Sequence, residues 1–508
     1  MTQYGRKNYS DVAPKDNVSA CSGNFETMNL LENAEARRVR TLHALDSDSQ
    51  ATRGQFFTPL LAARIIASLP NLPESGVFTI LDPGAGSGIL TAAIADRIHR
   101  LRPKLKMEIT AIENDIFLHP ALNETLQEIE RFTTAKTTLI PDSFLNWALS
   151  TTDRFDLVIQ NPPYAKLSSK SEEQALLRSN GIVVPNIYAA FMALALRVLR
   201  ESGQQVAITP RSWMNGSYYA TFRHQVTRIA GINAIHTFES RSKVFKDTGV
   251  LQEAVIVSMT KGSFPEQVDV YTSHDHLSAP SVRTVAYADV VTPDFVHIPA
   301  TELDTEAVAW MTRNVSCLLS DLGLTVSTGR VVDFRSRENL RVEHEKGAVP
   351  LLHASHLHGG HVQHPIRPKK PEWFVPDSEK TKNMLVDSGA YVLIKRFSAK
   401  EERRRVVAGI WESDEHAAFD NKLNFIHCNG GGIDPRIARG LWIFLNSTQL
   451  DRYFRVFSGH TQVNATDLRH MRFPTESQLL ELGSVEVDGQ ERIDAVVENI
   501  VVQETVAA

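Results

Sequence analysis

Cysteine is scarce in this sequence, and no long apolar run occurs in it. The 508 residues include three cysteines, Cys21, Cys317 and Cys428, which lie far apart. Their odd number and wide separation exclude a disulfide framework and the CxxC spacing of a metal site. No stretch approaches the roughly 18 apolar residues that a membrane helix needs, and the start MTQYGRKNYS has no apolar signal segment behind it. These absences predict a cytoplasmic protein without a membrane partner.

An excess of charge of either sign is also missing. The chain has 54 basic and 59 acidic side chains, which gives a formal net charge of −5. No global basic field indicates a nucleic-acid partner, so any such surface has to be local. The hydrophobic fraction of 42 % is ordinary for folded domains, and the length suffices for about two to four of them. A disordered, collagen-like or coiled-coil chain is excluded.

The segment from Val77 to about Lys261 alternates short apolar runs with amphipathic stretches. FTILD, MEITAIE, FDLVIQ and QQVAITP are predicted as buried strands, and ILTAAIADRIHRL and IYAAFMALALRVL as helices. Buried strands that alternate with helices predict a parallel sheet covered on both faces, the doubly wound α/β class. Just before this segment, Thr58 and Pro59 are predicted as the N-cap and the first residue of a helix.

Five parts are predicted along the chain. They are an N-terminal helical arm (1–50), the α/β domain (51–262), a connecting segment (263–320), a second domain (321–475) and a C-terminal tail (476–508). The second domain is expected to be mixed α+β, because beyond Leu324 short strand-like runs rich in histidine, arginine and aromatics replace the regular alternation.

A glycine-rich turn follows the first predicted strand. In TILDPGAGSGIL the strand ends at Asp82, the turn contains Gly84, Gly86 and Gly88, and a helix begins near Ile89. Glycines let a backbone approach a ligand closely, and a helix N-terminus offers free N–H groups. The GxGxG spacing is not the GxGxxG of dinucleotide binders, and the GK[ST] of a phosphate-binding loop is missing. The turn indicates a ligand, although NAD or a plain tight turn would use the same geometry.

Acidic residues follow the next two predicted strands. Glu113 ends MEITAIE, where a carboxylate can accept both hydroxyls of a ribose, and Asn114 comes directly after it. Asp142 follows TTLI, at a loop that would meet an adenine amino group, and Phe144 would flank that ring. These four residues extend the predicted ligand site.

The segment FDLVIQNPPY places a polar motif at the end of a buried strand. Asn161, Pro162, Pro163 and Tyr164 stand where ligands bind in open α/β sheets. The two prolines remove two N–H donors and leave carbonyl acceptors, and Asn161 adds a side-chain carbonyl. Two converging acceptors suit an exocyclic amino group, and Tyr164 offers a flat face to a planar base.

In this order, DPGAGSG, the strand-end glutamate and NPPY resemble the gamma class of amino-group DNA methyltransferases, with the Taq-type adenine-N6 enzymes as reference. GQFFTP, NIYAAF and SKVFKDTGVLQEAVIV resemble further motifs of the class, which together cover about residues 50–260. The resemblance implies a class I, Rossmann-like domain with S-adenosyl-L-methionine as cofactor. It also implies that Thr58 holds the methionine moiety and that Phe245 stacks on a flipped adenine. Asp82 replaces a glutamate, which keeps the carboxylate.

The resemblance implies direct methyl transfer to adenine N6 in double-stranded DNA. Accepting the amino hydrogens at Asn161 and the Pro162 carbonyl would aim the nitrogen at the methyl group, and the base must first leave the duplex. Cytosine-N4 methylation and protein-glutamine methylation remain alternatives, because both act on a similar NH₂ group. Cytosine-C5 methylation is excluded, since no cysteine follows a proline. The intact cofactor loop argues against a specificity subunit without activity.

The second domain is expected to recognise the DNA target. KRFSAKEERRR, from Lys395 to Arg405, holds six basic and two acidic residues, and GHTQVNATDLRHMRFP at 459–474 resembles the closing segment of target-recognition domains. The candidate phosphate or base contacts are Arg330, Arg335, Arg337, Lys395 and Arg396.

Five histidines cluster in HASHLHGGHVQHP, namely His353, His356, His358, His361 and His364. The stretch contains no HExxH and no accompanying carboxylate or cysteine set, so no metal site is predicted.

The resemblance implies a bacterial or archaeal restriction-modification system. The partner would be a restriction endonuclease that acts on the same site, and the methyltransferase would be a monomer or a dimer. The arm before the catalytic domain is too short for a fused nuclease domain, so cleavage would belong to another chain. The length resembles that of the Pst-type modification enzymes, which makes CTGCAG the first target sequence to test.

Overall fold

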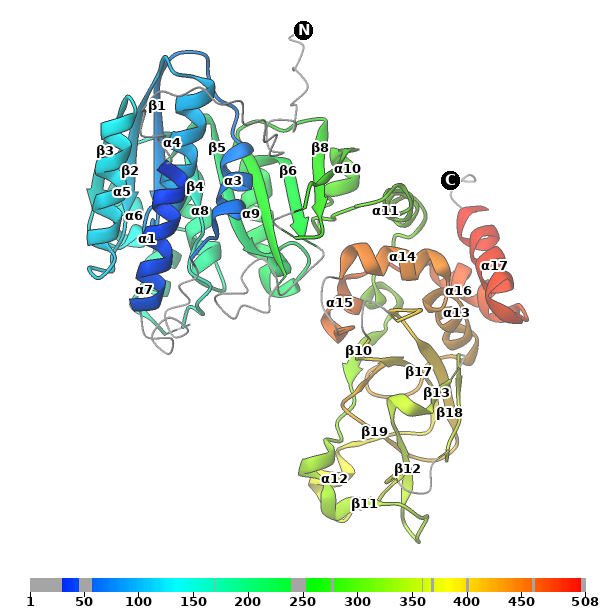
Figure 1. The fold of residues 1–508 in the computed structure, drawn as a ribbon. Helices are drawn as coiled ribbons and strands as arrows, with labels where there is room; N and C mark the ends of the chain where they lie inside the picture. The colour runs from blue at the N-terminus through cyan, green and yellow to red at the C-terminus, as the bar shows by residue number, and fades with distance from the viewer. Residues whose placement is uncertain are drawn as a thin grey trace. The chain divides into compact units, whose positions relative to one another are not determined.

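The computed structural model describes residues 30–44, 57–168, 170–238, 253–275, 278–358, 360–366, 370–398, 402–458 and 462–503. The chain divides into two compact units, residues 1–300 and 301–508, which Figure 1 draws from blue to green and from green to red. Within the described part of the chain, no helix is long and apolar enough to cross a membrane.

A nine-stranded sheet forms the centre of the first unit, in the order β3-β2-β1-β4-β5-β7-β6-β8-β9. The strands are β1 (Gly76–Pro83), β2 (Leu105–Ile112), β3 (Ala135–Ile140), β4 (Phe155–Gln160), β5 (Leu199–Pro210), β6 (Ala230–Phe238), β7 (Ala254–Lys261), β8 (Gln267–Ser273) and β9 (Ser281–Ala286). The first five pair in parallel, whereas β7 runs antiparallel to both β5 and β6. The carboxyl ends of β1 to β5 therefore share one edge, which is where ligands bind in such sheets.

Helices cover both faces of this sheet (Figure 1). They are α1 (Leu30–Ala44), α3 (Leu60–Ser68), α4 (Ile89–Leu101), α5 (His119–Phe132), α6 (Phe144–Ser150), α7 (Glu172–Ser179), α8 (Ile187–Val198), α9 (Ala220–Ile229) and the short α10 (Tyr287–Val290). In β4, Leu157 and Ile159 pack with α1, α3 and α4, while Val158 packs with α6 and α8. The three central residues, Leu157, Val158 and Ile159, are apolar because both faces of the strand are buried there, as the doubly wound class requires.

Two boundaries of the first unit differ from the predicted ones. Strands β8 and β9 continue the sheet through β6, so residues 263–286 belong to this domain and do not connect it to the next. Helix α1 is not a separate arm, because Leu30 and Ala34 are buried in the same core as α3 and α4. The Arg37 guanidinium also forms an ion pair with Glu128 of α5.

The second unit combines two small sheets with a helical layer. The sheet orders are β10-β20-β17-β18-β14-β13 and β11-β15-β12-β19-β16. The strands are β10 (Thr325–Thr328), β11 (Leu340–Arg341), β12 (Val349–Leu352), β13 (Leu357–His358), β14 (His361–Val362), β15 (Trp373–Phe374), β16 (Leu385–Val386), β17 (Gly389–Lys395), β18 (Ala408–Ser413), β19 (Ala417–Phe419) and β20 (Leu423–His427). This agrees with the mixed α+β character expected beyond Leu324.

The helices of the second unit include the C-terminal segment. They are α11 (Glu302–Asn314), α12 (Glu379–Lys382), α13 (Pro435–Leu445), α14 (Thr448–Phe457), α15 (Ala465–His470), α16 (Glu476–Ser484) and α17 (Gly489–Gln503). A Cβ on Gly440 of α13 would lie 2.0 Å from the Leu479 carbonyl oxygen, and one on Gly483 of α16 would lie 1.9 Å from that of Arg436. Helices α13 and α16 therefore pack backbone to backbone, so residues 476–503 are part of the folded unit and not a tail.

Candidate active site

The Asn-Pro-Pro-Tyr motif follows the last residue of β4, at the carboxyl edge of the sheet. The Asn161 side-chain nitrogen donates a hydrogen bond to the hydroxyl oxygen of Thr58 at 3.0 Å, and Thr58 is 2 % exposed. The N-cap position of α3 is Pro59, which makes no side-chain cap. The predicted capping role of Thr58 is therefore wrong, because its hydroxyl is turned toward Asn161.

Tyr164 is held by the neighbouring strand and by another ring. Its hydroxyl donates to the carbonyl of Ile208 in β5 at 3.3 Å, and its ring meets that of Tyr188 edge-on with centroids 6.2 Å apart. Burial raises the pKa of the Tyr164 phenol above its ordinary value, so the group stays neutral. The ring is thus a fixed apolar surface, as stacking on a planar base requires.

A cavity of about 770 Å³ opens beside the motif. Its walls come from the loops after β1, β2, β3 and β4 and from the start of α8. Eight of the predicted site residues line it: Gly84, Gly86, Glu113, Asn114, Asp142, Phe144, Asn161 and Pro163. The volume falls within the range of small-molecule and cofactor pockets.

Other predicted residues lie outside the cavity wall. Thr58, Asp82, Gly88, Pro162 and Tyr164 do not line it, although each stands within two residues of one that does. Phe245 lies outside the described residues.

The glycine turn has the backbone that its composition predicts. Gly84, Gly86 and Gly88 all have positive φ, and a Cβ on Gly88 would lie 2.9 Å from Thr125 Cγ2. The Gly86 N–H donates to Glu113 Oε2 at 2.9 Å. The Glu113 carboxylate is therefore oriented by the turn itself, and a second N–H, from Asp115, donates to its Oε1 at 2.9 Å.

Asp82 is buried directly before the turn. Its Oδ2 accepts a 2.6 Å hydrogen bond from the Thr91 hydroxyl, whereas its Oδ1 has no hydrogen-bond partner among the described residues. Burial raises the pKa of Asp82 to about 7. Burial also raises the pKa of Glu113, against the two N–H bonds that lower it. The site thus holds two carboxyl groups that bind protons more tightly than ordinary carboxyl groups do.

Aromatic rings form one end of the cavity. The rings of Phe144 and Phe191 lie 4.9 Å apart between centroids and both line the cavity, and Phe57 lines it from the segment before α3. Phe191 was not predicted as a site residue, although it closes the NIYAAF motif. An adenine ring would fit between such apolar faces and the Asp142 loop.

The histidine cluster of the second unit is joined to carboxylates that are distant from it in the sequence. Nδ1 of the fully buried His356 accepts the backbone N–H of His353 at 2.8 Å, so its Nε2 carries the proton and faces Glu372 Oε1 at 3.4 Å. Burial, followed by the neighbouring His364 and His353, lowers the pKa of His356 to about 4. The His364 Nε2 donates to the Glu372 carbonyl at 2.8 Å.

His353 is engaged through both ring nitrogens. They lie 2.7 Å from Asp420 Oδ2 and 2.9 Å from the Pro371 carbonyl oxygen. Both of these atoms are acceptors, so the ring donates twice; burial opposes the charge, but the bond to Asp420 raises the pKa of His353. Two groups, His356 with His364 and Glu372, and His353 with Asp333 and Asp420, hold ligand-type atoms within 4.8 Å of one another. Carboxylates distant in the sequence thus join the histidines, and the absence of a metal stays a prediction.

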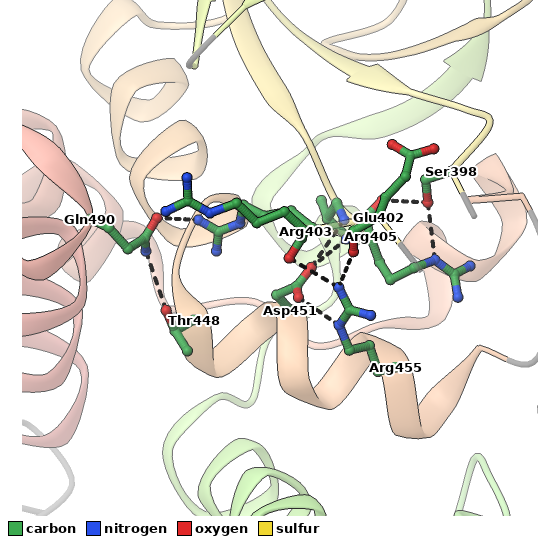
Figure 2. A network of polar contacts seen from close by, with 10 residues as sticks. Ser398, Glu402, Arg403, Arg405, Thr448, Asp451, Arg455 and Gln490 are labelled. Atoms are coloured by element: carbon green, nitrogen blue, oxygen red, sulfur yellow. Dashed lines mark hydrogen bonds and ion pairs between the residues drawn. The ribbon is translucent and has the colours of Figure 1, made fainter. Parts of the chain in front are cut away.

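Most described basic side chains of the run from Lys395 to Arg405 make contacts with other residues of the second unit. Arg405 is fully buried, and its Nε donates to Ser398 Oγ at 3.0 Å (Figure 2). Its guanidinium lies over the Phe454 ring. Arg404 donates to Gln490 of α17, and Lys395 Nζ bonds Glu402 at 2.8 Å. Among the described residues of the run, Arg405 and Arg404 are held against α14 and α17, whereas Arg403 is exposed.

The remaining candidate DNA contacts are more accessible. Arg335 and Arg337 are exposed, and Arg335 lies over the ring of Phe334, which is also exposed. Arg330 donates to the carbonyls of Asn383 and Leu385 at 2.7 and 3.2 Å. Arg396 is half-buried and donates to the Asn421 carbonyl at 3.1 Å. Three of the five candidate side chains, Arg330, Arg335 and Arg337, are therefore exposed and without ion pairs among the described residues.

Comparison with known proteins bears on both units. The model of the Eco57I restriction-modification methylase family matches residues 87–245. The chain is 38 % identical over 502 residues to type II methyltransferase M.BsuBI of Bacillus subtilis, which covers 94 % of this chain and 99 % of that protein. It is 39 % identical over 464 residues to type II methyltransferase M.PstI of Providencia stuartii, covering 87 % and 90 %.

Among solved structures, the type IIL restriction-modification enzyme MmeI in complex with DNA matches with a TM-score of 0.52 at 12 % identity. The match covers 94 % of this chain and 77 % of that one. At such low identity this likeness concerns the fold alone. The near full-length matches to M.BsuBI and M.PstI decide the family, and they agree with the class I arrangement of the nine-stranded sheet. The chain therefore belongs to the type II restriction-modification methyltransferase family that includes M.BsuBI and M.PstI.

Proposed function

We propose that this chain transfers a methyl group from S-adenosyl-L-methionine to the N6 amino group of adenine within a specific sequence of double-stranded DNA. The observation that carries the proposal is the orientation of Asn161. Its amide nitrogen is committed to Thr58, so its amide oxygen is the atom that can accept a hydrogen from a substrate amino group. Pro162, which lacks an N–H, places a second acceptor next to it.

The cavity fits the cofactor in size and in chemistry. The sulfonium of S-adenosylmethionine supplies the methyl group when bound. Glu113, held by two N–H groups, would accept the ribose hydroxyls. Phe144 and Phe191 would enclose the adenine ring, with Asp142 at its amino group. The role of these residues is to hold the reactants in register, because the transferred group is already activated.

The substrate nitrogen is activated by hydrogen bonding. The lone pair of an adenine amino group is delocalised into the ring, and acceptors at Asn161 and Pro162 favour the tetrahedral geometry that localises it. The target base must leave the duplex to reach these acceptors, and the fixed Tyr164 ring would offset part of the lost stacking. Phe245 would complete the enclosure.

The second unit would recognise the DNA sequence. The proposed contacts are Arg330, Arg335, Arg337, Lys395 and Arg396, and the first three of them are exposed. A restriction endonuclease that cuts the same sequence would be the functional partner in the bacterial cytoplasm.

Long-read detection of modified bases in DNA from cells that express the chain tests the proposal. N6-methyladenine at one recurring sequence, with CTGCAG as the first one to examine, is the expected result. The Asn161→Ala variant should fold and bind cofactor but leave the DNA unmethylated. Methylation at cytosine N4, methylation of a protein glutamine, or undiminished activity of Asn161→Ala would contradict the proposal.

A further inference from the structure

An exposed aromatic ring stands on the loop that follows β5. Residues Ser217–Tyr219 form a short 3-10 helix after the end of β5 at Pro210, and the Tyr218 side chain is 79 % exposed. Strands β4 and β5 are adjacent and parallel, so this loop lies at the same edge of the sheet as the Asn-Pro-Pro-Tyr motif. Tyr218 is therefore on the side from which a DNA base has to approach.

A continuous series of ring contacts links Tyr218 to the motif tyrosine. The rings of Tyr164 and Tyr188 have centroids 6.2 Å apart, Tyr188 stacks on Tyr219 at 5.7 Å, and Tyr219 meets Tyr218 edge-on at 6.1 Å. The series begins at the ring proposed to stack on the flipped adenine, and it ends at a ring in solvent. Its members come from the loops after β4 and β5 and from α8.

The residues next to Tyr218 are held by hydrogen bonds, although the Tyr218 ring is exposed. The Asn186 amide donates to the Tyr219 hydroxyl at 2.8 Å, and the Tyr219 N–H donates to the Gly216 carbonyl at 3.0 Å. The same carbonyl accepts from the buried guanidinium of Arg223 at 3.0 Å. The backbone on either side of Tyr218 is thus tied to its neighbours, which lowers the entropy lost when the ring contacts another molecule.

The side chain of Lys166 supplies a positive charge near the loop that carries Tyr218. Lys166 is exposed and lines the cofactor-sized cavity, and its backbone pairs with that of Asn186, the residue that supports Tyr219. Its ammonium forms no ion pair among the described residues. A phosphate of a bound strand would be the complementary charge.

On the basis of the proposed function, we propose that Tyr218 stacks within the DNA duplex at the place that the flipped adenine leaves. Removing one base from the stack exposes the faces of its neighbours, and a flat ring can cover them. Two contacts would then stabilise the state in which the adenine is flipped out: Tyr164 would stack on the flipped base, and Tyr218 would fill the gap in the duplex.

The test uses the full-length chain and a duplex that carries the methylated sequence, with 2-aminopurine in place of the target adenine. Its fluorescence rises when the base leaves the stack. Tyr218→Ala should reduce both this rise and the rate of methyl transfer on the adenine duplex by roughly tenfold or more, with unchanged affinity for S-adenosylmethionine. Tyr218→Phe should retain both activities, because the ring and not the hydroxyl is used.

Phe264→Ala is the matched control. Phe264 is 53 % exposed and follows β7, whose end pairs with the start of β5, so it lies at the opposite edge of the sheet. This variant should behave as the wild type. Normal flipping and turnover in Tyr218→Ala would overturn the inference, as would an equal loss of cofactor binding, which would indicate a role in the fold. A wild-type chain that methylates no DNA adenine would instead refute the proposed function.

Discussion

The amide of Asn161 and the hydroxyl of Thr58 are joined by a 3.0 Å hydrogen bond across 103 residues of sequence. The bond connects the loop after β4 with the segment that enters α3. It turns the amide nitrogen of Asn161 toward the protein. In the proposed function, the amide oxygen accepts a hydrogen of the substrate amino group. The hydroxyl can still donate its own hydrogen, so Thr58 can hold the cofactor and Asn161 at once.

Removing the Thr58 hydroxyl should leave the Asn161 amide without the hydrogen bond that orients it. In Thr58→Val the side chain keeps its shape but offers no acceptor, and a buried polar group that loses its partner costs about 1–3 kcal/mol. We expect single-turnover methyl transfer at saturating cofactor to fall by roughly tenfold to a hundredfold, whereas Thr58→Ser should stay near the wild-type rate. Equal rates for Thr58→Val and the wild type would show that the bond does not orient the amide.

Asp82 should make the cofactor-free protein less stable above neutral pH. Burial raises its pKa from 3.8 to about 7, so its contribution to stability is complete below pH 3.8 and is lost as the pH rises through 7. Asp82→Asn removes the buried charge and keeps an acceptor for Thr91. We expect the free energy of unfolding of the variant to exceed that of the wild type at pH 8, by at most about 4 kcal/mol, and to differ little from it at pH 4. Urea titrations at the two pH values measure this, and a variant that is no more stable at pH 8 contradicts it.

The first unit should bind cofactor without the second. Its apolar clusters use residues no later than Ile298, and its sheet ends at Ala286. We expect a chain that ends at Ala300 to bind S-adenosylmethionine in calorimetry with nearly unchanged affinity and to lose sequence-specific DNA binding. Selective methylation of one sequence by this fragment would show that recognition does not depend on the second unit.

Asp451 should stabilise the second unit. Its Oδ1 accepts the backbone N–H groups of Arg405 at 2.6 Å and Val406 at 3.3 Å, and its Oδ2 accepts Arg455 Nε at 2.8 Å (Figure 2). Asp451→Ala leaves buried donors unpaired, so we expect a loss of about 2–3 kcal/mol in the unfolding of this unit. Tryptophan fluorescence during denaturation measures it.

The control for Asp451 is Glu379→Ala. Glu379 forms an exposed ion pair with Lys382 in α12, and such pairs contribute little. A similar loss of unfolding free energy in both variants would mean that the buried network around Asp451 stabilises the unit no more than an exposed ion pair does.

The catalytic half of the structure was largely predictable from the sequence. Strands β1 and β4 and the second half of β5 contain buried apolar runs because both faces of the sheet are covered there. The glycine turn and the Asn-Pro-Pro-Tyr motif lie directly after β1 and β4. The sequence places β8 and β9 in the connecting segment, because exposed and buried residues are mixed along both strands and such a pattern does not distinguish an added sheet edge from a linker. Burial on both faces is the signal that a sequence carries most clearly.

The second unit was less predictable because its polar contacts join distant segments. The charge of Arg405 suggests a surface residue, but its position depends on partners distant in the sequence: Asp451, 46 positions later, accepts its backbone N–H, and its guanidinium lies over the Phe454 ring. Glu372 lies eight positions beyond His364, the last histidine of the cluster. This spacing matches no metal-binding motif, so the sequence does not indicate that the two residues meet. Thr58 similarly fits the pattern of a helix cap, whereas its partner is a side chain 103 positions away.

The separation of the two units at residue 300 has a consequence for how such a gene can diversify. The hydrogen-bond ladders of the nine-stranded sheet end at Ala286, and those of the second unit begin at Thr325. A recombination event between these points would exchange one complete hydrogen-bonded framework for another. Under the proposed function, replacement of the coding segment for the second unit would change the target sequence, while the residues proposed to bind the methyl donor would be inherited unchanged.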